Sequence, residues 1–207
     1  TTYMRILRAS LFWSFGLLGA VCAHAQFAEK MHTHYDADLG WVNRPNVDIP
    51  DLYGPGMDLR TNNQGFRNER EFPREVPAGK WRVLCSGDSF ALGYGVGQSD
   101  TWCAQLESLD PSFETVNMGQ GGYGVDQSYL WFMRDGTRLD FDAHLFTFTF
   151  TDFERMKYAN FFGYQKPVLT IEGGKLAARK AGPPDPDFKL SRLTRFRIWL
   201  HQFEWVQ

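Results

Sequence analysis

The stretch CSGDSFALGYGV, residues 85–96, decides the fold, because an apolar segment stops there at a glycine and a serine. The five residues that lead into it, 81–85, form a short apolar run of the kind found in central strands. Gly87 lets the backbone turn without a Cβ penalty. Residues 98–109 then carry apolar positions that suit a helix. The stretch therefore predicts a buried strand, a tight turn with Ser89 at its tip, and a helix.

The same alternation continues along the chain. Residues 113–117 predict a second strand, 123–134 a helix, and 143–150 a third strand in which Phe and Thr alternate at the end. Strands separated by helices of about a dozen residues imply right-handed crossovers and a mainly parallel sheet covered on both faces. The predicted fold class is α/β, three-layered and flavodoxin-like.

In such sheets, ligands bind beyond the carboxyl ends of the strands. Three segments of this chain follow predicted strands: the turn at Ser89, the glycines after Asn117, and the pair Thr151-Asp152. We expect them to converge on one site.

The first 25 residues predict a secretory signal peptide. Two arginines, Arg5 and Arg8, precede an apolar run over residues 11–23, and Ala23-His24-Ala25 fits a small-x-small cleavage site. The expected location is therefore periplasmic or extracellular. If the segment is not cleaved, it anchors the protein to the inner membrane, which is the only membrane contact expected. Cys22 lacks the leucine that usually stands three residues before a lipidated cysteine.

The chain of 207 residues has a formal net charge of -2, which suggests one main domain and gives no electrostatic reason to expect nucleic acid. Residues 26–80 are rich in Asn, Asp, Pro and Gly and predict a loop-rich lead-in. Residues 81–207 form the predicted main domain, with an insertion over 153–189 and a final amphipathic helix from about Ser191. The insertion holds several aromatic residues, which predict either the wall of a cleft or, as the preferred interpretation, the core of a cap: Phe153, Tyr158, Phe161, Phe162 and Tyr164.

Two cysteines follow the predicted signal peptide, Cys85 and Cys103. A disulfide is permitted in an exported protein, but we expect two buried thiols, because Cys85 falls on the central strand. The sequence has no CxxC motif and no pair of histidines at helical spacing, so no metal site is predicted. No glycine-rich phosphate-binding motif is present either, and no cofactor is predicted.

Three blocks of the sequence together resemble SGNH/GDSL hydrolases: Gly87-Asp88-Ser89-Phe90, the segment from Asn117 to Gly124, and Phe148-Thr149-Phe150-Thr151-Asp152. The resemblance implies that Ser89 is a nucleophile that forms an acyl-enzyme. It also implies an oxyanion hole made by the backbone N–H groups of Ser89 and Gly122, with a third donor at the end of the third strand. Asp88 is expected to brace the turn by accepting backbone hydrogen bonds rather than to act as a base.

Two positions depart from the pattern of that family. Thr151 stands where the family usually has Asn, so the third oxyanion donor would be a shorter hydroxyl. The family's catalytic Asp and His lie in a DxxH motif near the C-terminus, and no DxxH occurs here: Phe141 precedes His144 and Ile198 precedes His201 at that spacing. We therefore expect the chain to be C-terminally truncated, with the sheet incomplete and the base located beyond its end.

The expected function is that of an exported serine esterase acting on acyl or acetyl esters of carbohydrate or lipid, with a small-molecule or glycan ester as its partner. Two alternatives remain open. One is a catalytically impaired domain that binds envelope glycans or helps modify them, and the other is a carbohydrate O-acyltransferase. The sequence predicts neither the individual substrate nor the oligomeric state.

Overall fold

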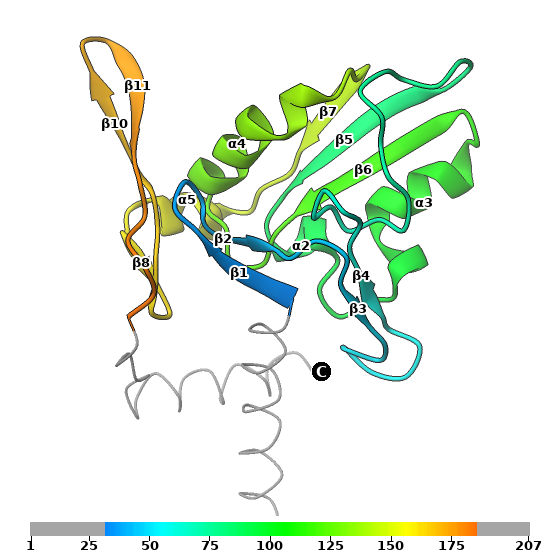
Figure 1. Cartoon of the computed structure of the whole chain (residues 1–207), viewed down its shortest axis with the longest axis horizontal. Coiled ribbons are helices and arrows are strands. Elements are labelled where there is room, and N and C mark those ends of the chain that lie inside the picture. Colours follow the sequence, from blue (N-terminus) through cyan, green and yellow to red (C-terminus); the bar gives the residue numbers. More distant parts are fainter. Residues whose placement is uncertain (1–31, 186–207) are drawn as a thin grey trace, which may run out of the picture.

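The computed structural model of the chain describes residues 32–185 (Figure 1). The predicted signal peptide and the predicted final helix from Ser191 lie outside these residues. Within 32–185, the structure contains no helix with the length and apolar character needed to cross a membrane.

A small parallel sheet of three strands forms the centre, in the spatial order β6-β5-β7. The central strand β5 spans Trp81–Gly87, and its neighbours are β6, Phe113–Gly119, and β7, Ala143–Phe146. Residues Leu84 and Val116 are register partners, and Leu84 also pairs with His144 on the other side. The chain is therefore a mixed α/β protein with a parallel sheet, as the sequence predicts.

Helices lie on both faces of this sheet (Figure 1). Helix α4, Val125–Arg134, covers one face, where Leu84 and Met118 form a buried cluster with Trp131. Helix α3, Trp102–Leu109, covers the other face. The period-two alternation of each strand supplies both clusters, because successive side chains point to opposite faces. The shorter helices include α2, Ser89–Leu92, η1, Gln98–Asp100, and η2, Gly136–Arg138.

A disulfide joins Cys85 on β5 to Cys103 on α3, with a Cα–Cα distance of 6.2 Å. The prediction of two free buried thiols is therefore wrong. Cys85 faces α3, and Cys103 is the buried residue of that helix. Because α3 follows β5 after two short helices and covers the face of β5 on which Cys85 lies, the two cysteines come within bonding range.

The lead-in packs against the sheet and forms two small hairpins. Strands β1, Thr33–Asp36, and β2, Gly40–Asn43, pair with each other, as do β3, Asp48–Ile49, and β4, Leu59–Arg60. Five of its buried apolar side chains join the core cluster below α4, and they are Leu39, Trp41, Val42, Phe66 and Phe72. The side chain of Arg67 is also buried, where it donates hydrogen bonds to four backbone carbonyls.

The third strand is shorter than predicted. It ends at Phe146 rather than at residue 150. Residues 147–149 then connect it to helix α5, Phe150–Met156. The alternation of Phe and Thr suggests a strand, but the backbone N–H of Thr149 donates to Asp152 Oδ2 at 2.7 Å. This contact at the helix start satisfies a backbone donor locally and favours the helix over a continued strand.

Two hairpins occupy the remainder of the predicted insertion. Strands β8, Asn160–Phe161, and β9, Tyr164–Gln165, form a tight one beside the carboxyl ends of the sheet. Strands β10, Val168–Glu172, and β11, Lys175–Arg179, form a longer one that projects from the body (Figure 1).

Candidate active site at the carboxyl ends of the strands

Ser89 is the first residue of α2, directly after the buried strand β5. The turn needs glycine at position 87, because a Cβ there would lie 2.5 Å from the backbone oxygen of Thr147. The backbone N–H of Phe90 donates to Asp88 Oδ1 at 2.9 Å, which confirms that Asp88 braces the turn. Ser89 is partly exposed, and its hydroxyl has no hydrogen-bond partner within residues 32–185. The geometry thus presents an unengaged hydroxyl at the strand end.

The loop after β6 runs alongside this turn. A Cβ on Gly119 would lie 1.9 Å from the backbone nitrogen of Leu92, so β6 and α2 touch backbone to backbone at this glycine. The backbone N–H of Gln120 donates to the oxygen of Gly87 at 3.1 Å. The loop that carries Gly122 is therefore tied to the turn that carries Ser89.

Gly122 has a φ of 77°, which favours glycine. A Cβ at this position would lie 2.5 Å from the ring of Phe161 on β8. Within the described residues, the backbone N–H of Gly122 has no hydrogen-bond acceptor. The amide is thus available as a donor, as an oxyanion hole requires.

Arg155 on α5 connects the three segments of the site. Its Nη1 lies 2.6 Å from Asp152 Oδ1, 3.3 Å from Asp88 Oδ2 and 3.0 Å from the backbone oxygen of Tyr123. Burial raises the pKa of Asp152 above its ordinary value, and the neighbouring carboxylate of Asp88 raises it further, while Arg155 opposes both. One guanidinium thus offsets the repulsion between two buried carboxylates.

Sequence reasoning missed this role of Arg155. The signal available was its spacing of three residues from Asp152, which places both side chains on the same side of a helix. That signal was hidden because residues up to 150 were predicted as strand.

Thr151 does not lie at a strand end. It is exposed in the first turn of α5, and its hydroxyl lies 2.7 Å from the hydroxyl of Thr149. The residue that adjoins Gly87 is Thr147, whose backbone N–H and hydroxyl both donate to the oxygen of Ser86. Of the predicted site residues, Ser89 and Gly122 are carried by segments tied to each other, and Thr151 is carried by the helix that follows.

Three histidines fall within the described residues, and none is hydrogen-bonded to Ser89. His144 instead contacts Ser86, and its ring stacks on Phe132 with a centroid distance of 3.8 Å. Burial lowers the pKa of His144 below its ordinary value. The described residues also contain no group of three His, Cys, Asp or Glu side chains that could hold a metal ion.

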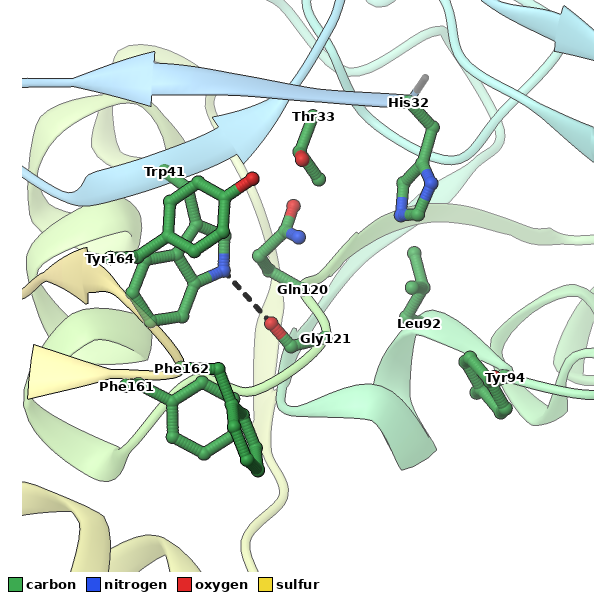
Figure 2. Close-up of a pocket in the computed structure, with 10 residues that line it drawn as sticks. All are labelled: His32, Thr33, Trp41, Leu92, Tyr94, Gln120, Gly121, Phe161, Phe162 and Tyr164. Atoms are coloured by element: carbon green, nitrogen blue, oxygen red, sulfur yellow. Dashed lines mark hydrogen bonds between the residues drawn. The ribbon is translucent and has the colours of Figure 1, made fainter. Parts of the chain in front are cut away.

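A pocket of about 40 Å³ opens beside the Gly122 loop (Figure 2). Five aromatic side chains line it, and they are Trp41, Tyr94, Phe161, Phe162 and Tyr164. Three aromatic residues of the insertion thus line a pocket, as the cleft alternative predicts, and two of them, Phe161 and Tyr164, also pack against the core cluster, as the preferred interpretation predicts. The other two, Phe153 and Tyr158, are exposed and are not part of the lining.

The chain matches no protein-family model and no curated protein. The resemblance to SGNH/GDSL hydrolases therefore depends on the residues of this chain alone.

Proposed function

We propose that this chain is an exported serine esterase of the SGNH/GDSL type, which hydrolyses acyl or acetyl esters of carbohydrate or lipid. The parallel α/β sheet supports the finer proposal of a three-layer, flavodoxin-like fold of that type. The observation that carries the functional proposal is the placement of Ser89. Its hydroxyl is unengaged at the end of the central strand, and a hydrogen bond ties its turn to the Gly122 loop.

In the proposed reaction, the Ser89 hydroxyl attacks the ester carbonyl while a base removes its proton. The alcohol leaves as the tetrahedral intermediate collapses to an acyl-enzyme, and water then releases the acid. The backbone N–H groups of Ser89 and Gly122 stabilise the negative oxygen of each tetrahedral intermediate. The hydroxyl of Thr151 serves as a third donor after turning away from Thr149. The base is a histidine, which this proposal places outside residues 32–185.

The described geometry also supports a second candidate from a different class. Because no histidine among residues 32–185 is hydrogen-bonded to Ser89, a domain that binds or helps modify envelope glycans without hydrolysis is consistent with the same fold. Transfer of the acyl group to a sugar hydroxyl instead of water is a variant of the first mechanism.

Acetate release from an acetylated oligosaccharide separates these functions. The esterase proposal predicts release by the product of the gene that carries the base, and none by its Ser89→Ala variant. Acetylation of an added unesterified oligosaccharide, lost in the same variant, would indicate the transferase. Absence of both activities, in the chain and in any longer product of the same gene, would favour the binding domain.

A further inference from the structure

The pocket beside the Gly122 loop is built from four separate segments, one of which is the end of α2 with Leu92 and Tyr94. Trp41 comes from the lead-in strand β2, Gln120 and Gly121 from the loop after β6, and Phe161 from β8. The indole N–H of Trp41 donates to the backbone oxygen of Gly121 at 2.9 Å. Because Gly121 directly precedes Gly122, the pocket shares its wall with the proposed oxyanion hole.

Gln120 is the polar group at the centre of this pocket. Its side chain is only 1% exposed, and its Oε1 is buried without a hydrogen-bond partner among the described residues. Figure 2 shows the carboxamide between the rings of Trp41 and Tyr164 on one side and His32 on the other. A buried acceptor without a donor is destabilising, because the loss of its contact with water is not compensated. Such an orphan acceptor indicates a ligand that brings a donor.

Phe162, at the same pocket, has an unfavourable backbone conformation. It forms the two-residue turn between β8 and β9 with Gly163, and their φ values are 46° and 87°. Positive φ at both positions is typical of a type I′ turn, which favours Asn-Gly. A bulky residue with positive φ is an outlier. Strained residues of this kind concentrate at functional sites, and here the strain presents an aromatic ring to the pocket.

The size and charge of the pocket limit its ligand. Its volume of about 40 Å³ is room for roughly three water molecules, so it receives one edge of a ring rather than a whole sugar. Among the described lining residues there is no carboxylate, ammonium or guanidinium group, which favours an uncharged ligand. An alkyl chain would fit the rings but would leave Gln120 Oε1 unpaired. A sugar edge offers C–H groups to the rings and a hydroxyl to the carboxamide.

We propose that this pocket is a subsite for an uncharged carbohydrate, which donates a hydroxyl to Gln120 Oε1 and packs an apolar edge on Phe161 and Phe162. This inference rests on the proposed function, because it selects carbohydrate over lipid as the substrate class. The bound sugar would contact Gly121, which directly precedes the proposed oxyanion donor Gly122, and Leu92 on the helix that Ser89 begins.

The test is a binding measurement on the Ser89→Ala chain, so that hydrolysis does not interfere. Saturation-transfer NMR with the methyl glycosides of glucose, galactose and mannose at millimolar concentration reports sugar contact. Octanoate tests whether the pocket binds an acyl chain instead, and galacturonate tests whether it binds a charged sugar. Gln120→Leu and Phe162→Asn test the pocket, and Tyr158→Ala is the matched control, because Tyr158 is an exposed aromatic residue outside the lining.

We expect at least one neutral glycoside to bind, and Gln120→Leu to weaken that binding about tenfold through the lost hydrogen bond. Phe162→Asn should weaken it as well. Both variants should keep or raise the Tm, because one removes an orphan acceptor and the other relieves the turn. Sugar binding that neither variant changes, binding of octanoate alone, or binding of no glycoside would overturn the proposal. Fluorophosphonate labelling of Ser89 in the wild-type chain is a separate readout, so failure of this subsite and failure of the esterase are distinguishable.

Discussion

The hydroxyl of Ser86 lies 2.6 Å from Nε2 of His144, across adjacent strands of the sheet. Ser86 precedes Ser89 by only three residues in the sequence. It is 1% exposed, however, and a substrate cannot reach it. The role of this serine-histidine contact is to satisfy a buried hydroxyl, while burial lowers the pKa of His144 and so favours the neutral imidazole. It is therefore a structural pair and not a catalytic one.

This pair makes stability depend on pH. Burial lowers the pKa of His144 below 6.5, so the unfolded chain takes up a proton more readily than the folded chain does. The contribution of the neutral His144 side chain to the free energy of unfolding is thus complete above about pH 6.5 and declines as the pH falls below this value. We expect urea midpoints to decrease from pH 7.5 to pH 5 by less in His144→Gln than in wild type.

A matched variant sharpens this measurement. Desolvation also lowers the pKa of His34, which lies on β1 away from the Ser86 pair. His34→Gln should leave the contribution of His144 in place. An identical pH dependence in wild type and His144→Gln would contradict this account of the pair.

The disulfide between Cys85 and Cys103 encloses a loop with a sequence separation of 18 residues. Closing a loop of this length stabilises a protein by about 3 kcal/mol in the chain-entropy model. Cys103→Ala should lower the free energy of unfolding by roughly that amount, and adding reductant should then have no further effect. Peptide mapping without reduction should yield one cross-linked species, and two separate thiol peptides would show that the bond is absent.

The contacts of Arg155 predict that removing its guanidinium lowers the free energy of unfolding by a large amount that depends on pH. Arg155→Met leaves the carboxylates of Asp88 and Asp152 buried without their cation, which costs about 3 kcal/mol. Because the pKa of Asp152 is raised already in wild type, acid protonates this group first and relieves the repulsion. The loss of stability in Arg155→Met should therefore be smaller at pH 5 than at pH 8. A cost that is equal at both pH values would refute the proposed charge balance.

The close packing of β6 on α2 predicts different outcomes for two neighbouring glycines. Gly119→Ala places a methyl group against the backbone of Leu92 and should cost about 3 kcal/mol, because backbone cannot move aside as a side chain can. Gly121→Ala is the control, since a Cβ there meets nothing within 4 Å. Thermal unfolding should separate the two variants clearly. Equal Tm values would mean that α2 does not lie where the structure places it.

Local patterns predicted much of the fold. The strand predictions at 81–85 and 113–117 are each two residues short, because β5 and β6 continue in register to Gly87 and Gly119. Glycine gives no propensity signal for a strand, and only pairing with the neighbouring strand extends it. The predicted helix at 123–134 begins at Val125. The predicted end of the third strand is wrong, because the alternation of Phe and Thr does not reveal the contact between Thr149 and Asp152.

The residues of the candidate site also differ in whether the sequence indicates them. The position of Ser89 at a strand end and the bracing role of Asp88 follow from the local chemistry of turns, whereas Gly122 is indicated by the resemblance to SGNH/GDSL hydrolases. Gln120 acts through its place in a pocket built by distant segments, so no local pattern indicates it. Arg155 has a local signal only in its spacing from Asp152, and its contacts with Asp88 and Tyr123 depend on the fold. The pairing of Cys85 with Cys103 likewise depends on how α3 packs on β5.

The central claim is that Ser89 is a nucleophile, and labelling by a fluorophosphonate probe tests it most directly. Ser86→Ala is the matched control, because this neighbouring serine is buried and hydrogen-bonded to His144. The probe is applied to the chain and to any longer product of the same gene. The account predicts labelling of wild type and of Ser86→Ala and none of Ser89→Ala. Labelling that persists in Ser89→Ala, or none in any form of the folded protein, would contradict it.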